Sequence, residues 1–219
     1  QGLTKDDLVL CLISGGGSAL LTLPAEGLTL EDKQRINKDL LNSGANISEM
    51  NCVRKHLSRI KGGRLARAAA PAKLLTLAIS DVPFDDPATI ASGPTVPDTT
   101  TLADAREIVA RYRIKADDAV IAALNDPANE SCKPGDAAFA NSDFKIIARP
   151  QESLDAAVAV ARKAGYDVIA LGADLEGEAR DVAAVHAQIA LKAHAEGRKL
   201  AILSGGELTV TVRGNGRGG

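Results

Sequence analysis

The sequence is poor in the features that mark several large classes of protein. Its 219 residues include no Trp and only 2% aromatic residues, so platforms on which nucleic-acid bases stack are not expected. The formal net charge of −2 gives no further reason to expect a nucleic-acid partner. No apolar run approaches the roughly 20 residues of a membrane-spanning helix, so no membrane partner is expected. A small-molecule substrate remains as the expected partner, and a homo-oligomer is left open.

Cysteine pairs and the familiar glycine motifs are also missing. The cysteines, Cys11, Cys52 and Cys132, are odd in number and far apart, so they predict neither a disulfide framework nor a zinc site, and a cytoplasmic location fits them best. No G-x-x-x-x-G-K-[ST] motif occurs, and no G-x-G-x-x-G motif precedes an acid at the dinucleotide-binding spacing. Residues 16–20 begin like a nucleophile elbow, but the closing glycine is absent, so Ser18 is not expected to be an acyl nucleophile.

Two apolar runs, at residues 8–13 and 200–203, each end in a glycine-rich turn. The turns consist of Ser14, Gly15, Gly16, Gly17 and Ser18, and of Ser204, Gly205, Gly206 and Glu207. Glycine has no Cβ and accepts positive φ, so an anion can lie against the bare N–H groups of such a turn. In open α/β sheets, ligands bind at the carboxyl edge of the strands. We therefore predict that both turns bind anionic ligand groups, the alternative being that they only close tight loops.

The order of apolar patterns predicts an α/β fold of two Rossmann-like units with largely parallel sheets. Residues 125–143 contain two prolines, one glycine and many small polar residues, which is typical of a linker between units 1–124 and 144–219. In the second unit, strand patterns alternate with helical patterns at residues 144–148, 153–164, 166–171, 178–196 and 199–203. This alternation predicts one parallel sheet with right-handed crossovers. Residues 207–212 form a further strand pattern with nothing after it to pack on, which predicts a fragment of a longer two-domain protein.

Three acids, Asp81, Asp85 and Asp86, follow the buried strand pattern at residues 74–79. Carboxylates at the end of a strand can hold Mg²⁺ together with phosphate oxygens, or accept a proton from a substrate hydroxyl. Because Asp before Pro is also a common turn former, a capped turn is the alternative. We take Asp81 as the candidate catalytic residue, and Asp81 and Asp85 as candidate magnesium ligands.

Basic residues are dense in and after the helix pattern at residues 48–61. They are Arg54, Lys55, His56, Arg59, Lys61, Arg64 and Arg67. This density suits a polyanionic ligand, and a solvated helix face explains it nearly as well. A structural role for His56, hydrogen-bonded to backbone, is favoured over general-base catalysis, and His186 and His194 are expected at the surface. Arg213 and Arg217 flank glycines in the last segment, where arginine can bind phosphate oxygens in a forked geometry or form a plain basic loop.

Several of these segments together carry a family resemblance. They are residues 13–20, 51–66, 80–83, 85–87, 91–95, 203–207, 210–214 and 216–219. In these segments the chain resembles the type II glycerate kinases, whose carboxyl-terminal half contains the MOFRL domain. The resemblance implies that residues 1–124 are part of an N-terminal Rossmann-like glycerate kinase domain and that residues 144–219 begin the MOFRL-containing domain.

The resemblance also implies an activity and a set of site residues. The expected reaction is phosphorylation of D-glycerate, usually to 2-phosphoglycerate, with ATP and Mg²⁺ in an interdomain cleft. Asp81 matches a family catalytic aspartate and Arg217 a family active-site arginine, while a family active-site lysine would precede Gln1. Members are often labelled hydroxypyruvate reductase. A reductase that uses NAD(P)H and an inactive truncated fragment are therefore the alternative hypotheses.

Overall fold

The computed structural model describes residues 2–80, 82, 85–211 and 214, and the chain divides into two compact units between Ile147 and Ala148. The expected α/β fold with parallel strands is confirmed. Within the described residues, no helix combines the length and apolar character that crossing a membrane requires.

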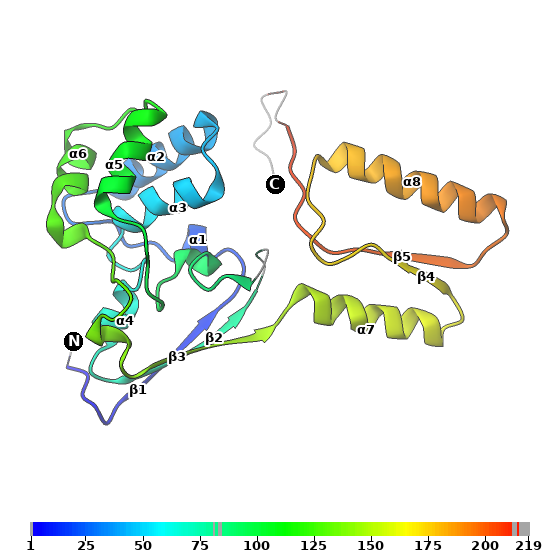
Figure 1. Ribbon diagram of the computed structural model, residues 1–219, viewed down its shortest axis with the longest axis horizontal. Coiled ribbons are helices and arrows are strands. Elements are labelled where there is room, and N and C mark those ends of the chain that lie inside the picture. Colours follow the sequence, from blue (N-terminus) through cyan, green and yellow to red (C-terminus); the bar gives the residue numbers. More distant parts are fainter. Residues whose placement is uncertain (1, 81, 83–84, 212–213, 215–219) are drawn as a thin grey trace. The chain divides into compact units, whose positions relative to one another are not determined.

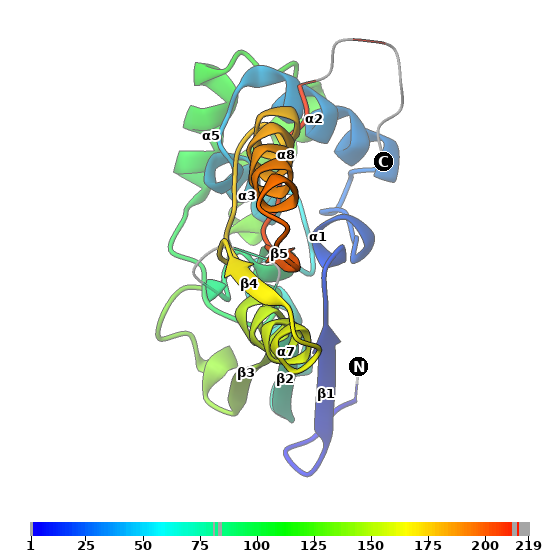
Figure 2. The same ribbon diagram turned by 90° about the vertical axis from the view of Figure 1, so that its right-hand side faces the viewer.

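The first unit is built on a three-stranded sheet. Its strands are β1 (Leu8–Ile13), β2 (Lys73–Ile79) and β3 (Ser142–Ala148), in the order β1-β2-β3. The strands β1 and β2 are parallel, so their carboxyl ends reach the same edge of the sheet. The strand β1 lies at the edge of the sheet (Figure 2). Because side chains alternate between the two faces of a strand, Leu8, Leu10 and Leu12 share one face, and all three are exposed.

Helices cover one side of this sheet (Figure 1). They are α1 (Gly17–Leu20), α2 (Leu30–Ser43), α3 (Ile47–His56), α4 (Arg64–Ala69), α5 (Leu102–Arg111), α6 (Asp118–Asn125) and the short 3₁₀ helices η2 (Ile90–Ser92), η3 (Pro127–Asn129) and η4 (Ala137–Phe139). The Thr29 hydroxyl accepts a hydrogen bond from the Asp32 amide, and the Asp32 carboxylate accepts one from the Thr29 amide, which fixes the start of α2. Gly44 ends that helix with φ +82°. The main core lies between α2, α3, α5 and α6, around Leu40 and Val53.

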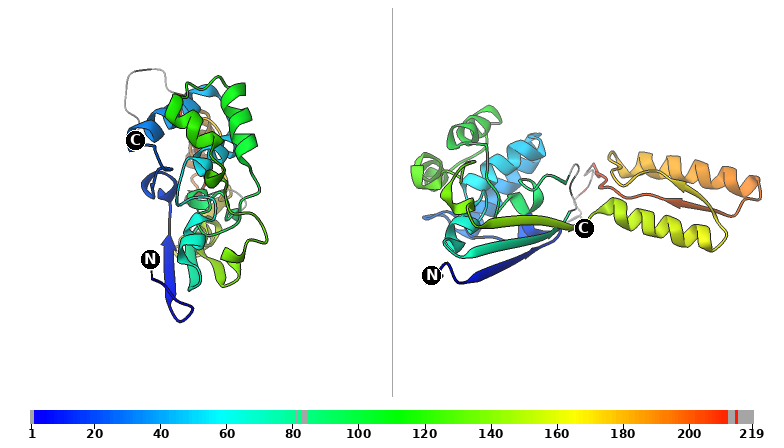
Figure 3. Two further views of the ribbon diagram at one scale, coloured as in Figure 1. Left: turned by 90° about the vertical axis from the view of Figure 1, so that its left-hand side faces the viewer. Right: turned by 60° about the horizontal axis from the view of Figure 1, so that its bottom comes forward.

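The second unit contains α7 (Pro150–Lys163), β4 (Asp167–Ala170), α8 (Ala179–Ala195) and β5 (Leu200–Leu203). The strands β4 and β5 are parallel, with Asp167 opposite Leu200, and they lie between the two helices (Figure 3). The β-α-β connection through α8 is the expected one.

Three expectations about chain organisation differ from the structure. The strand expected to open the second sheet is β3, which belongs to the first sheet. Residues 125–143 are not a free linker but pack within the first unit, because Cys132 is fully buried and its backbone bonds to Gly62 and Asp98 at 2.9 and 2.8 Å. Among the described residues after β5 there is no further strand, and Gly206 and Thr209 form only isolated bridges.

Candidate functional site

The first glycine turn leads from the end of β1 into α1 (Figure 1). Gly16 has φ +84°, a conformation that favours glycine, and its carbonyl accepts a hydrogen bond from Ala19 at 3.0 Å. Gly17 is packed so closely that an added Cβ would lie 2.8 Å from the Cβ of Ala91. Within the described ranges, the N–H groups of Gly15, Gly16 and Ser18 have no protein acceptor. The expected open amides are therefore present at this turn.

The turn forms one wall of a cavity of about 140 Å³. The lining residues are Ser14, Gly16, Gly17, Ser18, Ile47, Asn51, Arg54, Val82, Thr89 and Ala91. Two buried side chains connect the walls: the Ser92 hydroxyl donates to Asn51 Oδ1 at 3.4 Å and lies 3.4 Å from the Ser18 hydroxyl. Neither Asn51 nor Ser92 is among the site residues predicted from the sequence, although both fall in the segments that carry the resemblance.

The segment opposite the turn has an unusual backbone. Ala91, Ser92 and Gly93 have φ values of +52°, +62° and +58°, so two non-glycine residues in a row adopt the left-handed conformation. Ala91 and Ser92 are buried. Such conformations cost on the order of 1 kcal/mol or more for each non-glycine residue and cluster at binding and catalytic sites. The strained segment therefore supports a functional role for this cavity.

The basic residues around α3 do not form one surface. Lys55 and Asp98 form a buried ion pair at 3.1 Å. The Nδ1 atom of His56 lies 2.8 Å from the Cys52 carbonyl oxygen and its Nε2 atom 3.0 Å from Glu130 Oε1, so its structural role is confirmed. These residues hold the first unit together and do not reach the cavity.

The other basic residues divide into three groups. Arg64 is buried and donates to the Lys55 carbonyl at 2.7 Å. Arg59 and Arg67 are exposed, and Arg67 forms an ion pair with Asp136, which precedes β3. Arg54 lines the cavity, and Lys61 lies directly behind it. Only Arg54 and Lys61 of the seven are therefore placed to act on a ligand at the first turn.

The second glycine turn has fewer open donors. The Gly205 amide donates to the Gly172 carbonyl at 2.9 Å and the Glu207 amide donates to the Leu175 carbonyl at 3.1 Å. A Cβ on Gly205 would lie 3.2 Å from the Ala173 Cα, and one on Gly206 would collide with the backbone of Leu175. The glycines here allow the second turn to lie close to residues 173–175. The amides of Gly205 and Glu207 are hydrogen-bonded within the protein, so the expectation of bare amides is not met at these two residues.

The acidic candidates are only partly described. Asp81, Arg213 and Arg217 lie outside the described residues. Asp86 accepts hydrogen bonds from the Ala88 amide at 3.1 Å and the Thr89 hydroxyl at 2.6 Å, which makes it a turn-capping residue. Asp85 has φ +54°. Among the described residues there is no cluster of three or more His, Cys, Asp or Glu side chains that could hold a metal.

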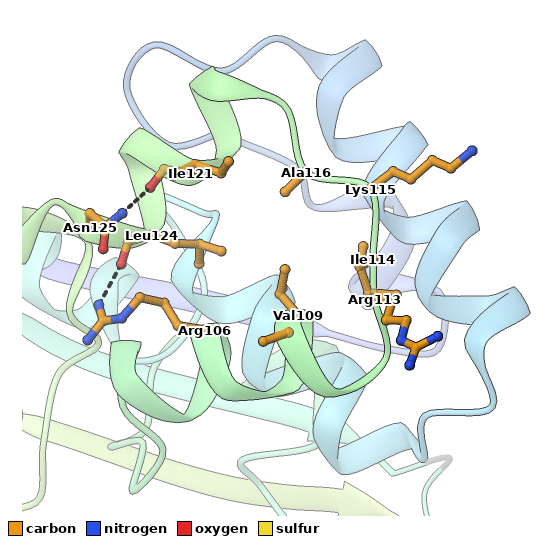
Figure 4. Close-up of a pocket in the computed structure, with 10 residues that line it drawn as sticks. Arg106, Val109, Arg113, Ile114, Lys115, Ala116, Ile121, Leu124 and Asn125 are labelled. Atoms are coloured by element: carbon orange, nitrogen blue, oxygen red, sulfur yellow. Dashed lines mark hydrogen bonds between the residues drawn. The ribbon is translucent and has the colours of Figure 1, made fainter.

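A larger hollow of about 400 Å³ lies between α5 and α6. Its floor is apolar, formed by side chains such as Val109 and Leu124 (Figure 4). Arg106 at its edge donates to the Leu124 carbonyl at 2.8 Å, and Asn125 donates to the Ile121 carbonyl at 2.9 Å. The charged residues that line this hollow are the cations Arg106, Arg113 and Lys115, and no acid, histidine, hydroxyl or thiol group lines it. Although the hollow between α5 and α6 is larger, it has no such group to act on a substrate. The cavity at the first turn is therefore the better candidate site.

Comparison with known proteins supports the resemblance inferred from the motifs. A protein of Agrobacterium vitis named as a hydroxypyruvate reductase is 55% identical over 225 residues, covering 100% of this chain and 50% of that protein. The D-glycerate 2-kinase of Thermotoga maritima is 38% identical, covering 99% of this chain and 51% of that protein. A crystal structure of glycerate kinase from the same organism matches with a TM-score of 0.79 at 38% identity, covering 100% of this chain and 52% of that one.

The chain spans about half the length of the curated relatives it matches. The family described as "Domain of unknown function (DUF4147)" matches residues 1–125, which include the first glycine turn and the cavity beside it. Because this family matches more than half of the chain, and because the relatives include glycerate kinases, the chain belongs to the DUF4147 family.

Proposed function

We propose that the protein carrying this chain phosphorylates D-glycerate with ATP and Mg²⁺ and forms 2-phosphoglycerate. The observation that carries the proposal is the small cavity where open turn amides meet the Arg54 guanidinium, in a chain whose relatives include glycerate kinases. Phosphoryl transfer depends mainly on positioning and charge neutralisation, and amides and guanidinium groups supply both.

The remaining roles follow from the resemblance. Asp81 would accept the proton of the attacking hydroxyl or hold the metal, with Asp85 as a second candidate ligand. Arg217 would offset the charge on the transferring phosphoryl group. Bound Mg²⁺ would supply charge neutralisation at the phosphate oxygens. The second turn, residues 204–207, would hold another anionic group. The interdomain cleft, the MOFRL domain and the cytoplasmic location stay predictions.

A hydroxypyruvate reductase is the second candidate function, because the Agrobacterium vitis relatives carry that name. The sequence contains no dinucleotide-binding fingerprint, which favours the kinase. A direct assay separates the two in the complete protein. ADP release that depends on glycerate supports the kinase, and NADH or NADPH consumption with hydroxypyruvate, in the absence of ATP, supports the reductase.

The role of Asp81 is tested by the variant Asp81→Asn. Loss of a positioned proton acceptor should reduce turnover at least about a hundredfold. The matched control is Asp118→Asn, because Asp118 is exposed in the first turn of α6. Turnover close to the wild-type value in Asp81→Asn, measured as glycerate-dependent ADP release, would remove Asp81 from the mechanism.

A further inference from the structure

Three cationic side chains from separate segments lie near one another, and one of them, Arg54, lines the cavity at the first turn. Arg54 lines the cavity, and its Nε atom donates to Asn37 Oδ1 at 2.5 Å. Lys33 lies on the same helix as Asn37, one turn earlier, so both side chains project from one face of α2. Lys61 Nζ donates to the carbonyl oxygen of Ser18 at 2.8 Å. Lys33 and Lys61 both repel Arg54, so positive charge from α2 and from the segment after α3 lies close to the side chain that lines the cavity.

The cluster has no anionic partner in the part of the chain that the structure describes. No ion pair joins Lys33, Arg54 or Lys61 to an acid there, whereas nearby Lys55 is paired with Asp98. The Nζ atom of Lys33 is buried and has no hydrogen-bond partner. Burial, together with repulsion from neighbouring cations, lowers the pKa of Lys33 and of Lys61 to about 8. Uncompensated buried charge is strongly unfavourable, so a ligand that supplies negative charge would stabilise this arrangement.

The size of the cavity limits what that ligand group can be. Its volume of about 140 Å³ is below the lower end, about 300 Å³, of pockets that enclose a drug-sized ligand. It can therefore hold a carboxylate or a single phosphate group but not a whole nucleotide. The open amides of Gly16 and Ser18 and the forked guanidinium of Arg54 match the oxygen atoms of such a group.

We propose that Arg54 and the amides of the first turn bind a small oxyanion, and that Lys33 and Lys61 provide the positive potential that holds it. The inference rests on the proposed function, in which two sources of this chemistry exist: the carboxylate of glycerate and the terminal phosphate of the nucleotide. Lys33 and Lys61 do not line the cavity and would contribute through their charge, and Lys61 also fixes the turn through the Ser18 carbonyl.

The test is isothermal titration of the complete protein with inorganic phosphate, with D-glycerate and with a non-hydrolysable ATP analogue. Arg54→Gln removes a charge-assisted contact and should weaken phosphate binding about tenfold to a hundredfold. Lys33→Met should weaken it by about tenfold. Controls are Arg59→Gln and Lys38→Met, because both side chains are exposed and lie on or near the same helices. The controls should bind phosphate like the wild type.

The other two ligands identify the source of the oxyanion. A selective loss of glycerate affinity in Arg54→Gln assigns the cavity to the acceptor carboxylate, and a selective loss of analogue affinity assigns it to the nucleotide phosphate. Unchanged affinity for all three ligands in both Arg54→Gln and Lys33→Met would overturn the inference, as would equal losses in the controls. Lys33→Met removes an unpaired buried charge and is expected to fold. This variant therefore still tests the inference if Arg54→Gln fails to fold.

Failure of this inference is distinguishable from failure of the proposed function. Phosphate binding that depends on Arg54, in a protein without glycerate-dependent ADP release, would support the oxyanion site and reject the kinase. Glycerate-dependent ADP release with unchanged ligand affinities in both variants would support the kinase and reject the site.

Discussion

Replacing Lys33 by Met should stabilise the ligand-free protein at pH 7. The side chain keeps its length, while a buried ammonium without a hydrogen-bond partner is removed. The pKa of Lys33 is about 8 in the folded protein against an ordinary value of 10.5. At about 1.4 kcal/mol per pH unit, this difference corresponds to a penalty of about 3 kcal/mol in the free energy of unfolding. The main cause is burial, followed by repulsion from Arg54 and Arg64.

The stability advantage of Lys33→Met depends on pH. The folded-state pKa lies below the unfolded-state value, so the penalty is fully present below about pH 8. It is released as the pH rises from about 8 to 10.5, because the folded protein has lost a proton that the unfolded chain still binds. The advantage of Lys33→Met over the wild type should therefore shrink across this range.

Urea unfolding at pH 7 and pH 10 measures this advantage, and urea is preferred because it carries no charge that would screen the cluster. The matched control is Lys38→Met, an exposed position on the same helix, which should change stability by less than about 0.5 kcal/mol. A variant Lys33→Met that is less stable than the wild type at pH 7, or whose advantage does not change with pH, would refute the reasoning.

Three further predictions concern the packing around the site. Gly17→Val should lower phosphate affinity in titrations. It should also destabilise the first unit by about 1–3 kcal/mol, because even a Cβ at residue 17 would lie 2.8 Å from the Cβ of Ala91. Unchanged stability of this variant would show that the segment around Ala91 can move. Lys55→Met should cost about 3–5 kcal/mol in urea unfolding by leaving Asp98 buried without its partner, and Lys55→Met combined with Asp98→Asn should recover part of this loss. Thr29→Ala should cost about 1 kcal/mol through the lost cap of α2, whereas Thr29→Ser should not.

Local patterns in the sequence determined most of the secondary structure. The strand at residues 8–13 has the expected bounds. The bounds of α2 follow from equally local residues, the capping box of Thr29 and Asp32 at its start and Gly44 at its end. These signals are local because they depend on side chains within one or two turns of the backbone atoms they bond. The first glycine turn follows from the same kind of signal: an apolar strand that ends directly in glycines needs no distant contact to be recognised.

Long-range packing decided what the local patterns left open. The composition of residues 125–143 is typical of a linker, but the Cys132 backbone bonds to Gly62 and Asp98, which are distant in sequence. The strand at residues 142–148 could have joined either sheet, and its neighbours in space, not its own residues, placed it in the first.

The partition of the basic residues also required the tertiary structure. From the sequence, Arg54, Lys55 and Lys61 are equivalent charges in one helical region. In the structure Lys55 has a buried acid as its partner, whereas Arg54 and Lys61 lie at the cavity with no such acid in the described chain. Whether a cationic side chain has a structural role or can bind a ligand depends on the groups that other elements place next to it. Tertiary packing determines those groups, and the neighbouring residues in the sequence do not.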